Sequence, residues 1–165
     1  MLEDAFRLAT DAHSSEDAGE TEARHPVQVA ELLAAGGFDD ELVAVALLHD
    51  LVEDTPVSLD EIDDRFGEPV ARLVAILTED PSILSYPARK GEHRARVAAA
   101  GERAATVYAA DKVAKLRAAR RGGPELRPEQ LDHFAATLGD LRAANPDLPF
   151  LTELESELER LPESP

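Results

Sequence analysis

The amino-acid sequence predicts an all-α protein. Ala, Leu, Glu and Arg dominate the composition, and the alternating β-branched residues typical of strands are nearly absent. Apolar residues recur at helical spacing between breaks made by Gly, Pro and polar residues. A chain of 165 residues is long enough for one domain with a hydrophobic core and short for two. We therefore expect one domain over residues 1 to 165, built from about eight helices.

Capping residues and glycine or proline breaks predict where these helices begin and end. The polar stretch "SSEDAGETEAR", residues 14 to 24, predicts a loop, so that His25-Pro26 opens the second helix. Ser58 and Glu61 have the spacing of a capping box. The helices are expected at residues 2 to 14, 26 to 35, 39 to 54, 58 to 66, 69 to 79, 89 to 101, 103 to 121, 128 to 143 and 150 to 161.

Composition excludes several classes of protein. A net charge of -17 argues against nucleic acid as the main partner, because affinity for its backbone comes from clustered Lys and Arg. The absence of cysteine excludes disulfides and thiolate metal ligands. The start "MLEDAFRLA" is not a signal peptide, and the longest strongly apolar run, "LVAVALL", is far too short for a membrane span. We expect a cytoplasmic protein with no membrane partner.

Positive charge is concentrated in one part of this acidic chain. Residues 86 to 121 contain ten Lys or Arg and only three acids. A basic segment in an acidic protein indicates a local anion site. The alternative is that two solvated helix faces pair with acidic neighbours.

The stretch "LLHDLVEDT", residues 47 to 55, places four polar groups in an apolar helix. On a continuous helix, His49 and Glu53 share one face, and Asp50 and Asp54 share the next. The C-terminal end of a helix carries partial negative charge, so anions there are unfavourable unless a cation compensates. Imidazole nitrogen and carboxylate oxygen together suit Mn²⁺, Fe²⁺ or Zn²⁺. These residues therefore predict a divalent metal.

Two adjacent ligands do not hold a metal by themselves, so further ligands are needed. His25, next to a proline that fixes a helix start, and Asp111, flanked by alanines in "YAADKVAKLR", are the best candidates. Taken alone, His25 is a capping or core histidine, and Asp111 is an ion-pair partner of a neighbouring lysine. His93 is one further histidine, too few for a second metal. We expect His13 to be structural or at the edge of the site, and His133 to lie on the surface.

The order His, then His-Asp, then Asp resembles the signature of the HD-domain phosphohydrolase superfamily. Within it, "HPVQVAELL", "ALLHD", "VEDT" and "FG" stand at spacings similar to those of the hydrolase domain of the RelA/SpoT homologue family, which includes small alarmone hydrolases. The resemblance covers about residues 5 to 121 and is strongest from 25 to 79. Residues 125 to 161 then form a helical C-terminal extension.

The resemblance implies an HD-type helical bundle with one catalytic divalent metal, usually Mn²⁺, with Fe²⁺, Zn²⁺, Ni²⁺ and Co²⁺ as alternatives. It implies that Glu53 and Asp54 orient or activate the attacking water. The implied metal ligands are His25, His49, Asp50 and Asp111.

The basic segment then has a role in binding a phosphorylated substrate. Lys112 and Lys115 follow Asp111 closely, and Arg117, Arg89 and Lys90 are candidates to bind further phosphates. Three departures from the family concern the substrate. The segment at residues 14 to 24 is shorter, acidic and lacks aromatic residues, Asp11 stands where an arginine is common, and Lys115 stands where the family usually has asparagine.

These features predict a metal-dependent phosphohydrolase of a nucleotide-type substrate, with (p)ppGpp 3′-pyrophosphate hydrolysis as the leading activity. One alternative is hydrolysis of another nucleotide or phosphorylated metabolite. A second is a non-catalytic module that binds nucleotide as a regulator, and a diiron oxygenase is a more distant third. The sequence leaves the oligomeric state open, with a homodimer as one alternative.

Overall fold

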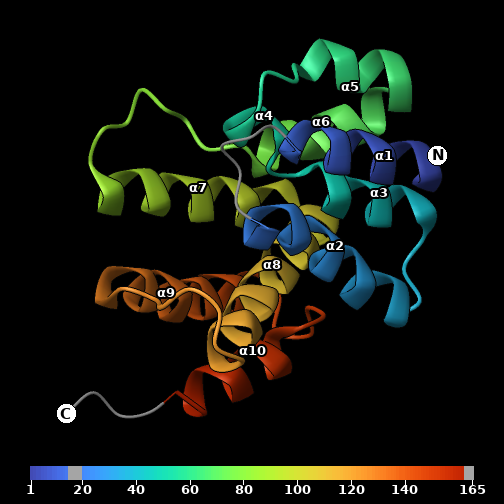
Figure 1. Cartoon of the computed structure of the whole chain (residues 1–165). Helices are drawn as coiled ribbons and strands as arrows, with labels where there is room; N and C mark the ends of the chain where they lie inside the picture. Colours follow the sequence, from blue (N-terminus) through green and yellow to red (C-terminus); the bar gives the residue numbers. More distant parts are fainter. Residues whose placement is uncertain (15–19, 162–165) are drawn as a thin grey trace. The chain divides into compact units, whose positions relative to one another are not determined.

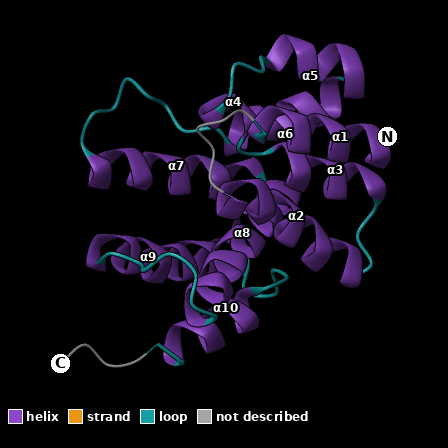
Figure 2. Cartoon of the chain, viewed as in Figure 1, coloured by secondary structure: helices purple, strands orange, loops and turns teal. Residues whose placement is uncertain are grey.

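The fold is all-α, as the sequence predicts (Figures 1 and 2). The computed structural model describes residues 1–14 and 20–161, and within these ranges it contains ten helices and no strand. None of the described helices is long and apolar enough to cross a membrane. The expected cytoplasmic location stays a prediction. The helices are α1 (Leu2–His13), α2 (Glu20–Ala35), α3 (Asp40–Leu48), α4 (Leu51–Asp54), α5 (Leu59–Phe66), α6 (Glu68–Leu77), α7 (Tyr86–Ala100), α8 (Glu102–Arg120), α9 (Pro128–Ala144) and α10 (Leu151–Glu159).

The chain divides into two compact units, which meet in the sequence between Asp80 and Pro81. The first unit contains α1 to α6, and the second contains α7 to α10. The single domain expected from the sequence stays a prediction.

Helix α3 is the centre of the first unit. It packs against α1, α2 and α6, and every residue from Leu42 to Leu48 is buried. The Asp39 side chain caps its start by accepting a hydrogen bond from the Leu42 amide at 2.9 Å. A helix that is apolar on all sides is stable only when neighbours cover it completely. The packing of α3 therefore fixes the position of the chain where this helix ends, at His49.

The helix predicted from residue 39 to residue 54 is interrupted. Helix α3 ends at Leu48, and the single turn α4 begins at Leu51, so the dipeptide His49-Asp50 lies in the break. Asp50 has φ -95° and ψ -7°, and its carbonyl oxygen accepts hydrogen bonds from the amides of Glu53 and Asp54. The sequence predicted that His49 shares a helix face with Glu53, and Asp50 with Asp54. Because the helix is broken here, the rotation of 100° per residue behind that prediction does not hold across the dipeptide.

The predicted start of the second helix is also wrong. Helix α2 begins at Glu20, so Pro26 lies inside it and residues 20 to 24 are helical instead of a loop. The remainder of that predicted loop, residues 15–19, lies outside the described residues. Pro26 costs the helix one backbone hydrogen bond, but Glu, Ala and Arg before it are strong helix formers. His25 therefore projects from within a helix.

Helix α8 is the centre of the second unit, where it packs against α7, α9 and α10. Alanines make up much of its buried length, which allows close approach of its neighbours. Helix α7 begins at Tyr86, three residues before the predicted start, with Pro87 in its first turn. In the first unit, one of the two hydrogen bonds of the predicted capping box is present, because the Ser58 side chain accepts a hydrogen bond from the Glu61 amide at 3.2 Å.

Candidate metal centre

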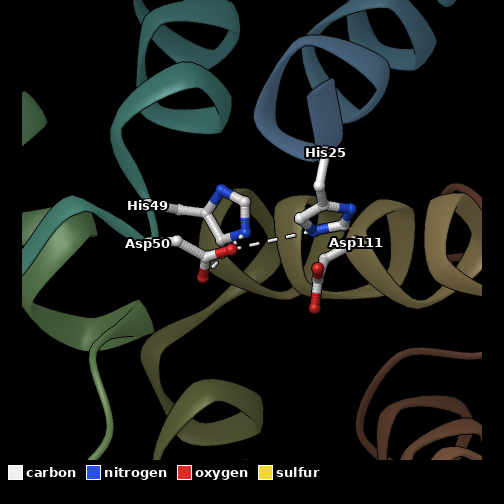
Figure 3. Close-up of side chains that lie close together, drawn as sticks. All are labelled: His25, His49, Asp50 and Asp111. Carbon is white, nitrogen blue, oxygen red and sulfur yellow. Dashed lines mark ion pairs between the residues drawn. The ribbon is translucent and has the colours of Figure 1, made fainter. Parts of the chain in front are cut away.

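Three of the predicted metal ligands come together within the first unit. His25 projects from α2, and His49 and Asp50 lie in the break between α3 and α4 (Figure 3). Each offers a ligand atom within 4.8 Å of the others. The Asp50 carboxylate lies between the imidazoles, with Oδ1 3.1 Å from His49 Nε2 and Oδ2 3.7 Å from His25 Nε2. Two nitrogen donors and one carboxylate thus converge on one point.

The hydrogen bond of His49 determines which of its ring nitrogens faces this point. Nδ1 lies 2.7 Å from the carbonyl oxygen of Ala46. A carbonyl oxygen only accepts, so Nδ1 carries a proton, and in the neutral ring Nε2 presents its lone pair. That lone pair faces a carboxylate oxygen of Asp50, and two acceptors at 3.1 Å repel each other. A cation between them, a proton or a metal ion, removes the repulsion.

The donor set fits a divalent metal. The side chain of His49 is 5% exposed, and those of His25 and Asp50 are 13% and 20% exposed, so the donors are shielded but remain reachable. The Nδ1–H of His49 bound to a backbone carbonyl is the outer contact that usually orients a metal-bound histidine. Imidazole with carboxylate suits Mn²⁺, Fe²⁺ and Zn²⁺. The geometry of these three residues supports the predicted site.

The fourth predicted ligand, Asp111, belongs to the second unit. It is buried in the middle of α8, where its carboxylate accepts from Lys112 Nζ at 2.5 Å and from Lys115 Nζ at 3.1 Å. Burial lowers the pKa of Lys112 to about 8, although the neighbouring Asp111 charge opposes this change. Ion pairing with lysine, the alternative considered for Asp111 alone, is thus present within this unit. Its role as a metal ligand stays a prediction.

The two predicted catalytic carboxylates lie on α4 and are exposed to solvent. Glu53 Oε1 accepts a hydrogen bond from the backbone amide of Glu79 at 2.5 Å. This contact joins α4 to the segment that follows α6 and holds the Glu53 carboxylate in one orientation. The sequence does not predict it, because the two residues are 26 positions apart. The catalytic roles of Glu53 and Asp54 stay predictions.

The predicted substrate-binding cations fall into three groups within the second unit. Lys112 and Lys115 contact Asp111, as described above. Lys90 Nζ lies 5.4 Å from the centre of the Tyr86 ring, and the Arg89 guanidinium lies 5.8 Å from it. Arg117 donates through Nε to Glu157 at 3.0 Å, so a carboxylate already engages its guanidinium. Binding of phosphate by these five residues stays a prediction.

The prediction that His133 lies on the surface is wrong. His133 is 4% exposed, accepts a hydrogen bond from Arg94 Nη1 through Nδ1 at 2.9 Å, and lies 3.4 Å from the hydroxyl of Tyr108 through Nε2. Burial, followed by the charges of Lys112, Lys90 and Arg94, lowers its pKa to about 2. Helical spacing with Thr137 and Leu141, which are also buried, was a signal for this burial.

His13 is buried at the end of α1, with Nδ1 2.7 Å from the carbonyl oxygen of Ala9, which agrees with its expected structural role. His93 is also buried, with its ring 5.0 Å from that of Tyr108.

Acid is expected to destabilise the protein partly through His133. Between pH 6.5 and about 2 the unfolded chain binds a proton at this residue that the folded chain does not, so the free energy of unfolding falls as the pH falls. The contribution is about 1.4 kcal/mol per pH unit. His133→Asn, whose side-chain oxygen can still accept from Arg94, should show a shallower decline from about pH 6 to about pH 4 in denaturant titrations. Equal slopes for the variant and the parent protein would contradict this assignment.

Comparison with known proteins gives one family match, to the HD domain, over residues 5–137. A guanosine-3′,5′-bis(diphosphate) 3′-pyrophosphohydrolase of Danio rerio is 38% identical over 103 residues, which are 61% of this chain and 57% of that protein. An enzyme of the same name from Aquifex aeolicus is 38% identical over 94 residues, which are 56% of this chain and 13% of that protein. The bifunctional (p)ppGpp synthase/hydrolase SpoT of Escherichia coli is 43% identical over 75 residues, 44% of this chain and 11% of that protein. The chain thus spans less than two thirds of each of these relatives.

Two solved structures are similar over most of the chain. A metazoan orthologue of SpoT, which hydrolyses ppGpp and plays a role in starvation responses, aligns with a TM-score of 0.80 at 25% identity. The alignment covers 96% of this chain and 94% of the other. A protein of Listeria monocytogenes EGD-e aligns with a TM-score of 0.73 at 29% identity and covers 86% of this chain and 95% of the other.

Proposed function

The chain belongs to the HD-domain family, and we propose that it is a divalent-metal-dependent phosphohydrolase with (p)ppGpp as its leading substrate. The observation that carries this proposal is the convergence of His25, His49 and Asp50, with a histidine lone pair facing a carboxylate. A divalent cation at this point would remove the repulsion between the lone pair and the carboxylate. The names of the relatives support a guanosine bis(diphosphate) as substrate and hydrolysis as the reaction.

We propose Asp111 as the fourth ligand and Mn²⁺ as the metal. The HD-domain match spans residues 5–137 and therefore includes all four residues of the signature. Asp111 is a buried carboxylate that pairs with Lys112 and Lys115, so the support for it as a ligand is its place in the signature. A set of two imidazoles and two carboxylates is of the intermediate hardness that suits Mn²⁺.

The reaction requires a water molecule that attacks the 3′-pyrophosphate, with release of pyrophosphate and a 3′-hydroxyl. When bound, the metal lowers the pKa of water and polarises a phosphoryl oxygen. Asp54 and Glu53 are the proposed acceptors of the water's proton, and the Glu79 amide holds Glu53 in position for this task. Lys112 and Lys115 supply positive charge beside Asp111 that can offset charge on the phosphates. The nucleotide is thus bound by cations and cleaved by carboxylate-assisted attack of water.

A second substrate class remains a candidate because two recognition features differ from the family. Asp11 replaces a common arginine, and Lys115 replaces the usual asparagine. Lys115 contacts Asp111 directly, so this replacement changes the charge next to a proposed ligand. Another nucleotide or phosphorylated metabolite could use the same metal and carboxylates.

The test is a substrate panel combined with metal analysis. Protein purified without chelator is expected to contain one divalent ion per chain, and with Mn²⁺ it should release pyrophosphate from ppGpp and pppGpp. Release from a different nucleotide alone would retain the reaction and correct the substrate. If the metal-loaded protein bound nucleotides but released no phosphate or pyrophosphate from any, a regulatory module would replace the enzyme. Two metal ions per chain would favour a dinuclear protein such as the diiron oxygenase alternative.

Two substitutions at Glu53 separate its proposed catalytic role from its structural one. Glu53→Gln keeps an oxygen that can accept the hydrogen bond from the Glu79 amide but cannot accept a proton, so activity should fall by about 100-fold or more while thermal stability is retained. Glu53→Ala loses both functions and should also lower the melting temperature. Full activity in Glu53→Gln would show that this carboxylate serves only to hold the segment after α6.

A further inference from the structure

A cavity of about 420 Å³ lies in the second unit, and none of its lining residues belongs to the HD signature. Its cationic side chains are Arg120 at the end of α8 and Arg160 just after α10, with Glu125 as the acidic one. Its apolar side is formed by Leu126, Leu131 and Leu161. The cavity therefore offers one charged wall and one apolar wall.

Glu157, on α10, organises the charged wall. This carboxylate is 3% exposed and contacts three guanidinium groups, Arg117 Nε at 3.0 Å, Arg120 Nε at 3.1 Å and Arg160 Nη1 at 3.7 Å. Burial raises its pKa, but hydrogen bonds from Arg120 and Arg117 outweigh that effect, so its pKa is below the ordinary value. Glu157 is thus a buried anion that holds several cations in place.

The side chains that line the cavity carry an excess of positive charge. Arg120 and Arg160 carry two positive charges and Glu125 one negative charge, while Arg117 and Glu157, which do not line the cavity, pair with each other. Arg160 is the weakest partner of Glu157, at 3.7 Å, and its side chain is 58% exposed. In a protein of net charge -17, a local excess of positive charge at a cavity favours an anion.

The turn that follows α8 shapes the edge of the cavity. Gly122 and Gly123 donate backbone hydrogen bonds to the carbonyls of Ala119 and Ala118. A Cβ atom at Gly123 would lie 2.6 Å from the Ala118 carbonyl oxygen, so only glycine allows this close return of the chain. These bonds also satisfy the last carbonyls of α8, which reduces the partial negative charge that a helix end presents.

The HD-domain match ends at residue 137, before the elements that complete the cavity. Arg160 and Leu161 follow α10, which lies in the C-terminal extension and packs against α8 and α9. Glu157, which holds the arginines, lies in the same extension. Arg160, Leu161 and Glu157 thus lie beyond the residues that match the HD domain.

We propose that this cavity is a second ligand site, which binds a small organic anion. The carboxylate or phosphate of the ligand pairs with Arg120 and Arg160, and its apolar body packs against Leu126 and Leu131. The site uses none of the residues assigned to the metal centre. An inorganic anion would contact only the arginines, whereas the proposed ligand also has an apolar part that packs against the leucines.

The probe is 8-anilinonaphthalene-1-sulfonate, titrated into the full chain and followed by fluorescence. Its neutral analogue N-phenyl-1-naphthylamine lacks the anionic group. We expect saturable binding of the anionic dye and at least tenfold weaker binding of the neutral one. Arg160→Gln should weaken the anionic dye about tenfold, the effect of losing one charged hydrogen bond. Absence of saturable binding, or equal binding of both dyes, would overturn the proposal.

A matched control is Arg142→Gln. Arg142 is an arginine of α9 that pairs with Glu155 through two hydrogen bonds and does not line the cavity. Arg142→Gln changes the net charge by the same amount as Arg160→Gln and should leave dye binding unchanged. Leu131→Phe, which fills the apolar wall, should weaken both dyes. Circular dichroism checks that each variant is folded. Equal affinities of Arg160→Gln and Arg142→Gln for the anionic dye would contradict the proposed site.

Discussion

Asp50→Asn is expected to remove the divalent metal and to lower pyrophosphate release by more than about 100-fold. Loss of a group that only orients a metal ligand commonly lowers metal affinity or activity 10–100-fold. Asp50 is itself a proposed ligand, so its loss should lower them further. Asparagine has nearly the same size, but it lacks the negative charge and presents an amide in place of one oxygen. Because Asp50 lies within 3.1 Å of His49 Nε2, its loss also removes the repulsion that the cation compensates.

The control for this substitution is Asp60→Asn on α5. Asp60 is an exposed carboxylate in the same unit, and its loss changes the net charge by the same amount. Metal content measured after gel filtration and the rate of pyrophosphate release together separate the two variants. Retention of one metal ion and normal activity in Asp50→Asn would exclude Asp50 as a ligand.

Leu48→Ala is expected to lower the free energy of unfolding by about 2–5 kcal/mol. Leu48 is the last residue of α3, is fully buried, and directly precedes His49. Its truncation removes apolar contacts and leaves a cavity at the centre of the first unit. Since the whole free energy of unfolding of a domain is only about 5–15 kcal/mol, the loss should be large in a guanidinium titration.

The matched control is Leu84→Ala, at a leucine that is 89% exposed. Truncation there removes the same atoms without opening a cavity, so the free energy of unfolding should change by less than about 0.5 kcal/mol. Similar losses in the two variants would contradict the packing described for α3.

The helical architecture was predictable because its signals are local. Asp39 and Ser58 stand where helices begin, and their side chains do cap α3 and α5. The apolar run from Leu42 to Leu48 predicted a helix buried on all sides, and it is. The candidate metal ligands were also predictable from local sequence. A histidine and an aspartate in an apolar stretch need a partner, such as a cation, that offsets the free-energy cost of burying them.

The errors have more than one cause, because strong helix formers before Pro26 extend α2, whereas contacts between distant segments bury His133. Glu20 to Ala35 form one helix through Pro26, although a proline usually marks a first turn. The helix through the HD dipeptide is broken at His49 and Asp50. His133 is buried against Arg94 and Tyr108, which are 39 and 25 positions away in the chain.

The sequence by itself determined the fold class, the family signature and the residue types available for chemistry, because helix propensity, capping and spacing act over a few residues. The tertiary structure decided which atoms of those residues meet. The Nδ1 contact with Ala46 selects the nitrogen that His49 presents to Asp50, and the Glu79 amide orients Glu53. Arg117 and Arg120 of α8 meet the buried Glu157 of α10, although 40 and 37 positions of sequence separate them from it. The Glu53 and Glu157 contacts join distant segments, so they depend on how the helices pack, whereas the His49 contact with Ala46 spans three residues and depends on the end of α3.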